Sequence, residues 1–147
     1  MLTIGKLGTE AGVKIPTIRY YEQIGLMPGA ERSAGNQRLY DRRALERLAF
    51  IRHARALGFT LEAIRDLLSL SDRPDQPCTA ADAIARAQLA EVESRLARLT
   101  ALKAELERMV AQCAGGRIAD CRVIEALGDH ALCASDHSPR HRPDTLW

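Results

Sequence analysis

Residues 79–112 carry the feature that most restricts the fold, a row of apolar positions spaced alternately four and three residues apart. The row consists of Ala85, Leu89, Val92, Leu96, Leu99, Lys103, Leu106 and Val110, with Leu102 beside its one charged member. This spacing predicts a continuous helix with a coiled-coil seam, which would span roughly 50 Å at about 1.5 Å per residue. Nothing else in the chain is long enough to cover such a stripe. We therefore expect the helix to pair with a second copy in a homodimer.

The first 25 residues predict two short helices. Thr3 is a favourable N-cap, apolar residues follow at helical spacing, and Gly12 ends the segment. A second helix begins at Ile15 and Pro16, because proline is tolerated in a first turn, and it runs to Gly25. Two short helices joined by a tight, glycine-containing turn predict a helix-turn-helix.

Residues 26–40 predict a small β-hairpin. The Gly35-Asn36 pair lies between two short segments and favours a turn, and Arg32 and Arg38 flank it. We interpret this basic hairpin as the wing of a winged helix-turn-helix.

Two more helices and a linker follow the hairpin. Asp41 is expected to cap a helix that ends at Gly58, and Thr60 to cap the next one. The prolines at 74 and 77 exclude a helix there, so the segment reads as a linker.

The C-terminal part is expected to be short and irregular. Gly115-Gly116 ends the long helix, Asp120 is the expected N-cap of a last helix over Cys121–Leu127, and the tail has no periodicity. The predicted organisation is a winged helix-turn-helix domain (1–71), a linker (72–78), a dimerisation helix (79–112), a metal-binding loop with a short helix (113–128) and a mobile tail (129–147).

Charge is distributed unevenly along the chain. Residues 1–58 hold ten Lys and Arg against five Asp and Glu, a formal charge of +5, and because the whole chain carries +2 the remainder carries −3. A basic module on an acidic body is typical of a domain that contacts nucleic-acid phosphates. A solvated surface of mixed charge is the alternative.

Several classes of protein find no support in the sequence. No run of about 18 apolar residues is present, which argues against a membrane span, and no secretion leader opens the chain. We therefore expect a cytoplasmic location, where cysteines indicate metal binding or redox chemistry rather than structural disulfides. The sequence has no phosphate-binding glycine loop and no nucleophile beside a base motif, so we do not expect an enzyme.

A set of motifs together resembles the MerR family of bacterial transcription regulators. The motifs are Thr3-Ile4-Gly5-Lys6-Leu7, Thr17-Ile18-Arg19-Tyr20-Tyr21-Glu22, Gly25-Leu26, Arg32-Ser33, Gly35-Asn36-Gln37-Arg38-Leu39-Tyr40 and Leu57-Gly58-Phe59-Thr60-Leu61-Glu62. The resemblance covers residues 1–127. It departs from the family pattern at Gln37, where these regulators usually have tyrosine.

The resemblance implies a mainly α-helical protein with a winged helix-turn-helix domain, a long dimerisation helix in an antiparallel coiled coil, and a C-terminal metal-binding loop. Members bind double-stranded promoter DNA whose spacer is too long for good contact with RNA polymerase, and the effector changes how they bend and untwist it. The second helix should enter the major groove while the wing contacts the backbone. The expected DNA-binding residues are Lys14, Thr17, Arg19, Tyr20, Arg32, Asn36, Arg38 and Tyr40. For one of the two adjacent tyrosines at 20 and 21, core packing is the alternative.

Cys113 and Cys121 flank the Gly-Gly break and can face one metal ion. The start of a helix at Cys121, with Arg117 and Arg122 nearby, favours the thiolate. In the antiparallel dimer that the resemblance implies, Cys78 of one subunit completes the site with these two cysteines of the other. In this family a cysteine at the start of the dimerisation helix accompanies sensing of divalent ions. The implied effector is therefore zinc, cadmium, lead or mercury.

Two alternatives for the cysteines remain open. The interval between Cys113 and Cys121 is also that of the family's copper(I) sensors. The same residues also allow a thiol redox sensor, although the tight iron–sulfur cysteine cluster of the family's redox branch is absent. In the tail, Cys133 with His130 and His137 is a candidate for a second site, and an incidental polar tail is the alternative.

Overall fold

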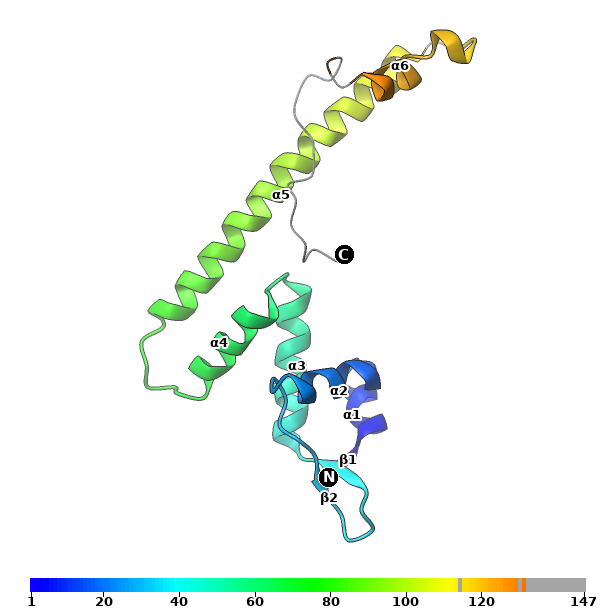
Figure 1. Ribbon diagram of the computed structural model, residues 1–147. Coiled ribbons are helices and arrows are strands. Elements are labelled where there is room, and N and C mark those ends of the chain that lie inside the picture. The colour runs from blue at the N-terminus through cyan, green and yellow to red at the C-terminus, as the bar shows by residue number, and fades with distance from the viewer. Residues whose placement is uncertain (114, 130, 132–147) are drawn as a thin grey trace. The chain divides into compact units, whose positions relative to one another are not determined.

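The computed structural model describes residues 1–113, 115–129 and 131, and the chain divides into two compact units, Met1–Gln88 and Leu89–Trp147 (Figure 1). The tail candidates Cys133, His130 and His137 lie outside the described residues. The first unit contains β1 (Leu2–Thr3), α1 (Ile4–Ala11), α2 (Ile15–Gln23), β2 (Glu31–Arg32), β3 (Arg38–Tyr40), α3 (Arg42–Ala56), α4 (Leu61–Ser71) and the first part of α5 (Thr79–Gln112).

The predicted helix starts of the first unit are confirmed. The side chains of Thr3, Asp41 and Thr60 each accept a hydrogen bond from a backbone N–H in the first turn of the helix that follows, as N-caps do. Gly12 ends α1 with φ of 68°, a left-handed conformation that favours glycine. Helices α1 to α4 and strand β3 enclose one aliphatic core. Its fully buried large side chains are Leu7, Ile18, Leu26, Leu48, Ile51 and Ile64.

The predicted wing hairpin is confirmed and gains a third strand. Strands β2 and β3 pair antiparallel, and β1 pairs with the other edge of β3 with Leu2 opposite Tyr40, so the strand order is β1-β3-β2. Sequence analysis missed β1 because a strand of two residues has no alternation to detect, and its pairing joins residues far apart in the chain.

Helix α5 covers Thr79–Gln112, as the seam predicted. The two compact units divide inside this helix at Gln88, whereas the predicted DNA-binding domain ends at residue 71. Residues 79–88 belong with the first unit, where the Gln88 side chain donates a hydrogen bond to the Leu57 carbonyl at 3.0 Å. No helix among the described residues is long and apolar enough to cross a membrane.

The second unit continues α5 into a loop, a 3-10 turn (Ile118–Asp120) and α6 (Arg122–Gly128). The expected N-cap of this last helix was wrong by one residue, because Cys121 and not Asp120 occupies the cap. Asp120 instead ends the 3-10 turn, in which its own backbone N–H donates to the Arg117 carbonyl.

Candidate DNA-binding surface and cysteine site

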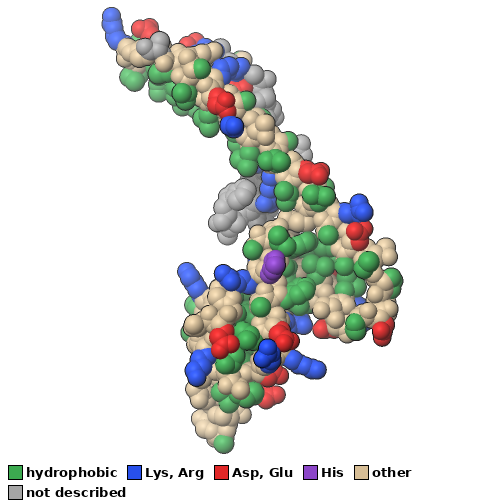
Figure 2. Space-filling view, turned by 180° about the vertical axis from the view of Figure 1, so that it is seen from behind, with side chains coloured by type: hydrophobic (Ala, Val, Ile, Leu, Met, Phe, Trp, Pro, Cys, Tyr) green, Lys and Arg blue, Asp and Glu red, His purple; other side chains and the backbone are tan. Residues whose placement is uncertain are grey.

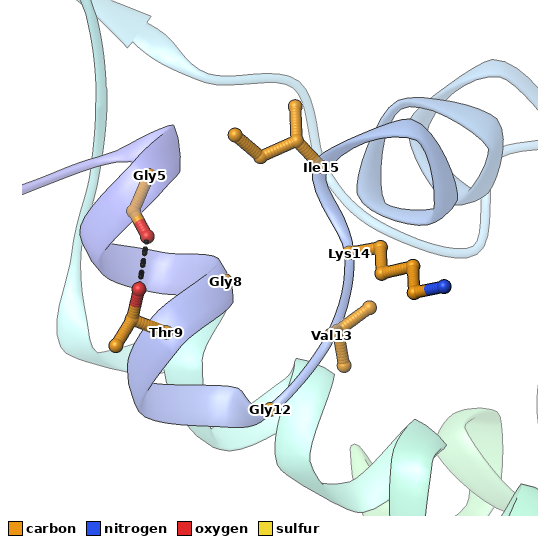
Figure 3. A pocket seen from close by; sticks show the side chains of 7 residues that line it. All are labelled: Gly5, Gly8, Thr9, Gly12, Val13, Lys14 and Ile15. Carbon is orange, nitrogen blue, oxygen red and sulfur yellow. Dashed lines mark hydrogen bonds between the residues drawn. The ribbon is translucent and has the colours of Figure 1, made fainter.

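Helix α2 begins beside an open pocket of about 320 Å³ that is lined by glycines of α1 and by the turn into α2 (Figure 3). Gly8 is required there, since an added Cβ would lie 2.6 Å from the Val13 carbonyl oxygen. Lys14 holds the N-cap position of α2 and points away from α1. The pocket thus leaves room for another molecule near the positive end of α2, with a lysine next to it.

The two adjacent tyrosines of α2 lie on different faces of the helix, one exposed and one in the core. Tyr20 is 48% exposed, whereas Tyr21 is 8% exposed and belongs to the core, so the core alternative applies to Tyr21. Arg19 is also exposed, and Thr17 is half-buried. Of the predicted DNA contacts on α2, Lys14, Arg19 and Tyr20 are therefore the most available to a partner.

The tip of the wing is fixed by Arg32. Its guanidinium donates to both the backbone carbonyl and the side-chain oxygen of Asn36, at 3.1 and 3.2 Å. Asn36 has φ of 63°, a left-handed conformation that asparagine tolerates in turns. Both side chains are exposed, so they are accessible and also hold the turn together.

Tyr40, an expected DNA contact, is buried rather than exposed at the surface. Only 2% of it is exposed, and its hydroxyl donates a hydrogen bond to the Glu22 carboxylate. Burial, followed by this hydrogen bond, raises the pKa of Tyr40 to about 12. Glu22 also pairs with Arg38 at 3.6 Å. The Tyr40–Glu22–Arg38 group therefore joins the wing to α2, with Arg38 alone of the three exposed.

Glu22 and Gly8 were not predicted as site residues. Glu22 does belong to one of the family motifs, but its role depends on a partner 18 residues away in the sequence, and no local pattern reveals that.

The second unit brings two of the predicted metal ligands together. The side chain of Cys113 lies near enough to Cys121 to help lower the pKa of the Cys121 thiol. Gly116, with φ of 104°, lets the loop between them turn. Arg122 closes the same loop from α6 by donating to the Gln112 side-chain oxygen at 2.7 Å.

The position of Cys121 at the start of α6 lowers its pKa. The backbone N–H groups of Ile124 and Val123 are the main causes, and the Cys113 thiol adds a smaller effect in the same direction. Arg122 is not among the causes of this lowered pKa. It stabilises the loop through its hydrogen bond to Gln112, and it also pairs with Glu125. Among the described residues no three His, Cys, Asp or Glu side chains gather as a metal site, so one chain offers two thiols here.

The apolar seam of α5 is exposed along its length, and Figure 2 shows hydrophobic side chains following the helix. Leu96 is 63% and Val110 71% exposed, although burial of such side chains is favourable. The exposed seam residues are Leu89, Val92, Leu96, Leu99, Leu106 and Val110. A groove lined by residues between Leu99 and Ala111 follows the last turns of this face.

Family models match most of the chain. A model described as "MerR HTH family regulatory protein" matches residues 2–71, and one described as "MerR, DNA binding" matches residues 45–109. The chain belongs to the MerR family. It is a DNA-binding transcription regulator and not an enzyme, and regulators of this family bind promoter DNA as dimers.

Individual relatives are similar over nearly their whole length. The HTH-type transcriptional regulator ZntR of Escherichia coli is 42% identical over 130 residues, which covers 86% of this chain and 92% of that protein. The crystal structure of PbrR691 from Ralstonia metallidurans in complex with lead(II) matches with a TM-score of 0.74 and 41% identity, covering 86% of this chain and 99% of that one. MerR from Bacillus megaterium in complex with mercury(II) matches with a TM-score of 0.62 and 30% identity, covering 87% of this chain and 100% of that one.

Proposed function

We propose that this regulator responds to a divalent soft metal ion, zinc, cadmium, lead or mercury, which it binds through cysteine thiolates. The observation that carries the proposal is the lowered pKa of Cys121 at the start of α6, caused mainly by the backbone N–H groups of Ile124 and Val123 and to a smaller extent by the side chain of Cys113. Thiolates are the ligands that these ions prefer. The relatives solved with lead(II) and mercury(II) support the same class of effector.

The third ligand in this proposal is Cys78 of the other subunit in a homodimer. Cys78 is exposed and comes directly before α5, whose 34 residues separate it along the chain from Cys113. The exposed seam supports pairing of two α5 helices. Antiparallel pairing brings the start of one helix beside the end of the other, so the bound ion would depend on the geometry of the dimer.

The dimer is proposed to act on double-stranded promoter DNA through α2 and the wing. Lys14, Thr17, Arg19 and Tyr20 would contact the major groove and its phosphates, while Arg32, Asn36 and Arg38 hold the backbone beside it. For Tyr40 we propose an indirect role, in which it positions Arg38 through Glu22. Metal binding would change the distortion of a promoter that RNA polymerase also occupies, and the regulated genes would serve metal resistance or efflux.

A metal titration of the reduced, full-length dimer tests this function. We expect zinc, cadmium, lead or mercury to bind at one ion per thiolate site, with the ultraviolet absorption of metal–thiolate bonds for the last three. The metal should also raise transcription from the cognate promoter. Cys113→Ser and Cys121→Ser should abolish the response, and Cys78→Ser should weaken divalent binding.

The two alternative effectors give different results in the same titration. Tight copper(I) binding that Cys78→Ser leaves unchanged would sink the divalent proposal in favour of copper(I). A response of metal-free protein to peroxide, with a disulfide formed between Cys113 and Cys121, would instead identify a redox sensor.

A further inference from the structure

Two arginines from other helices bind carbonyl groups just beyond the end of α2, at its C-cap Ile24 and at Leu26. Arg47 of α3 donates from Nε to the Leu26 carbonyl at 2.9 Å, and Arg65 of α4 donates from Nη2 to the Ile24 carbonyl at 2.7 Å. Leu26 is fully buried, so its carbonyl needs a partner inside the protein. The direction of the DNA-reading helix is thus set partly by side chains of α3 and α4.

Electrostatics explains why arginines occupy these places. The C-terminal end of a helix carries a partial negative charge, and α2 has no basic residue in the last turn of its described residues Ile15–Gln23. Arg47 and Arg65 supply the missing positive charge from outside the helix. Their hydrogen bonds also have a charged donor, which makes them stronger than bonds between neutral groups.

Arg47 has a second partner that Arg65 lacks among the described residues. Its Nη1 lies 3.6 Å from a carboxylate oxygen of Asp72, the C-cap of α4 and first residue of the linker. A carboxylate at the C-terminal end of a helix opposes the helix dipole, and the guanidinium offsets this. One cation therefore lies between the ends of α2 and α4.

We propose that Arg47 is a positioning residue that couples the linker to the DNA-reading helix, through one guanidinium shared between the Leu26 carbonyl and the Asp72 carboxylate. A displacement of the linker at Asp72 then changes how firmly the end of α2 is held. Arg65 holds α2 without this connection.

The linker leads from Asp72 into α5, and the start of α5 is bound to the same unit (Figure 1). Gln88 donates to the Leu57 carbonyl, and a Cβ on Gly58 would lie 2.5 Å from the Gln88 side-chain nitrogen. Gly58 has φ of 87°, a left-handed conformation that favours glycine, so the Gln88 amide can lie directly against this turn. The regulatory part of the proposal, which rests on the proposed function, is that a metal-induced shift at the start of α5 reaches α2 through Asp72 and Arg47.

Hydrogen exchange on metal-free, full-length dimer tests the mechanical link. The backbone N–H groups of Leu26 and Met27 both donate to the Tyr21 carbonyl, so their exchange reports the end of α2. Asp72→Asn should speed their exchange about two- to fivefold, as expected for loss of one exposed ion pair, and Asp72→Glu should restore it. Asp75→Asn, in a linker acid that pairs with no described residue, should leave it unchanged.

Transcription at saturating protein tests the regulatory part. Asp72→Asn should lower the ratio of transcription with and without metal about two- to fivefold, with metal affinity unchanged. Arg65→Gln should speed exchange at the end of α2 but keep the ratio.

Each outcome decides one claim. Unchanged exchange in Asp72→Asn, or an equal increase in Asp75→Asn, overturns the link. Faster exchange in Asp72→Asn together with a full metal response overturns the regulatory use of the link. A loss of metal response in Arg65→Gln that equals the loss in Asp72→Asn overturns it as well. If transcription by the wild type responds to no metal, the proposed function and the regulatory use fail together. The exchange data still test the mechanical link between Asp72 and the end of α2.

Discussion

The two units of the chain bury their apolar side chains in different ways. In the first unit, helices α1 to α4 and β3 enclose a core whose largest members are fully buried. In the described part of the second unit only Glu105, Met109 and Ala126 are buried, while the leucines and valines of the seam are exposed. The first unit buries its apolar side chains within one chain. The second unit leaves an apolar surface exposed, as one half of a subunit interface does.

This difference fits the two tasks in the proposed function. A DNA-reading surface benefits from a rigid scaffold, because each contact must be held at a fixed place. A switch needs two arrangements of similar free energy, which an interface between subunits provides more readily than a packed core. The predictions below test how independent the two units are.

The largest effect is expected from charges in the seam. Leu96→Lys combined with Leu99→Lys removes two large apolar groups per subunit, worth about 1.5–3 kcal/mol each, and places like charges together. We expect a monomer in sedimentation at micromolar concentration. Promoter binding should be at least about 100-fold weaker, because the two losses together reach about 3 kcal/mol and each tenfold change in affinity corresponds to roughly 1.4 kcal/mol. Ala97→Lys combined with Ala104→Lys, at two exposed positions outside the seam, is the charge-matched control and should stay dimeric. A dimer in the double variant would contradict the assignment of the seam.

A cavity in the core of the first unit should have the next largest effect. Leu48→Ala in α3 removes a fully buried side chain and should cost about 2–5 kcal/mol in the free energy of unfolding measured with urea. Leu57→Ala, just beyond α3 and half-exposed, is the control and should cost well under half as much. Dimerisation should persist in both at low urea, and its loss in Leu48→Ala would show that the units do not act independently.

A smaller effect is expected from Tyr40→Phe, which removes one hydrogen bond between the wing and α2. The hydroxyl donates to a carboxylate, so the loss should be about 1–3 kcal/mol in the free energy of unfolding. Promoter binding should weaken too, because Arg38 loses part of its support.

The same hydrogen bond predicts a dependence on pH. The pKa of Tyr40 is raised from 10.0 to about 12 in the folded state, so its contribution is complete below pH 10 and is lost as the pH rises through 12. Wild type should therefore lose stability more steeply over that range than Tyr40→Phe. Parallel curves would mean that the hydroxyl makes no bond that matters for folding.

The features that the sequence predicted well have local causes. The caps Thr3, Asp41 and Thr60 act within one turn, and the seam repeats over many turns, so each leaves a pattern in neighbouring residues. These signals were enough for the fold and for the length of α5.

What the sequence did not predict depends on distant partners. Strand β1 forms because β3 offers it an edge to pair with, and the hydroxyl of the buried Tyr40 has a hydrogen-bond acceptor because Glu22 of α2 lies next to it. Arg47 looked like one basic residue among ten, and its place between Leu26 and Asp72 appears only in three dimensions. Such pairings join residues 18 to 38 positions apart, beyond any local pattern.

The smallest effect concerns the thiol of Cys121 in the metal-free, reduced protein. Its pKa lies below the ordinary value, chiefly because the backbone N–H groups of Ile124 and Val123 stabilise the thiolate. Its alkylation by iodoacetamide, followed by mass spectrometry across pH, should thus have a midpoint below that of the same residue in guanidinium-unfolded protein. Cys113→Ser removes only the weakest of the three causes, so the midpoint should remain low. A midpoint that rises to the unfolded value in Cys113→Ser would show that the paired thiols, rather than the start of α6, create the thiolate, and the second unit would then owe its chemistry to the loop alone.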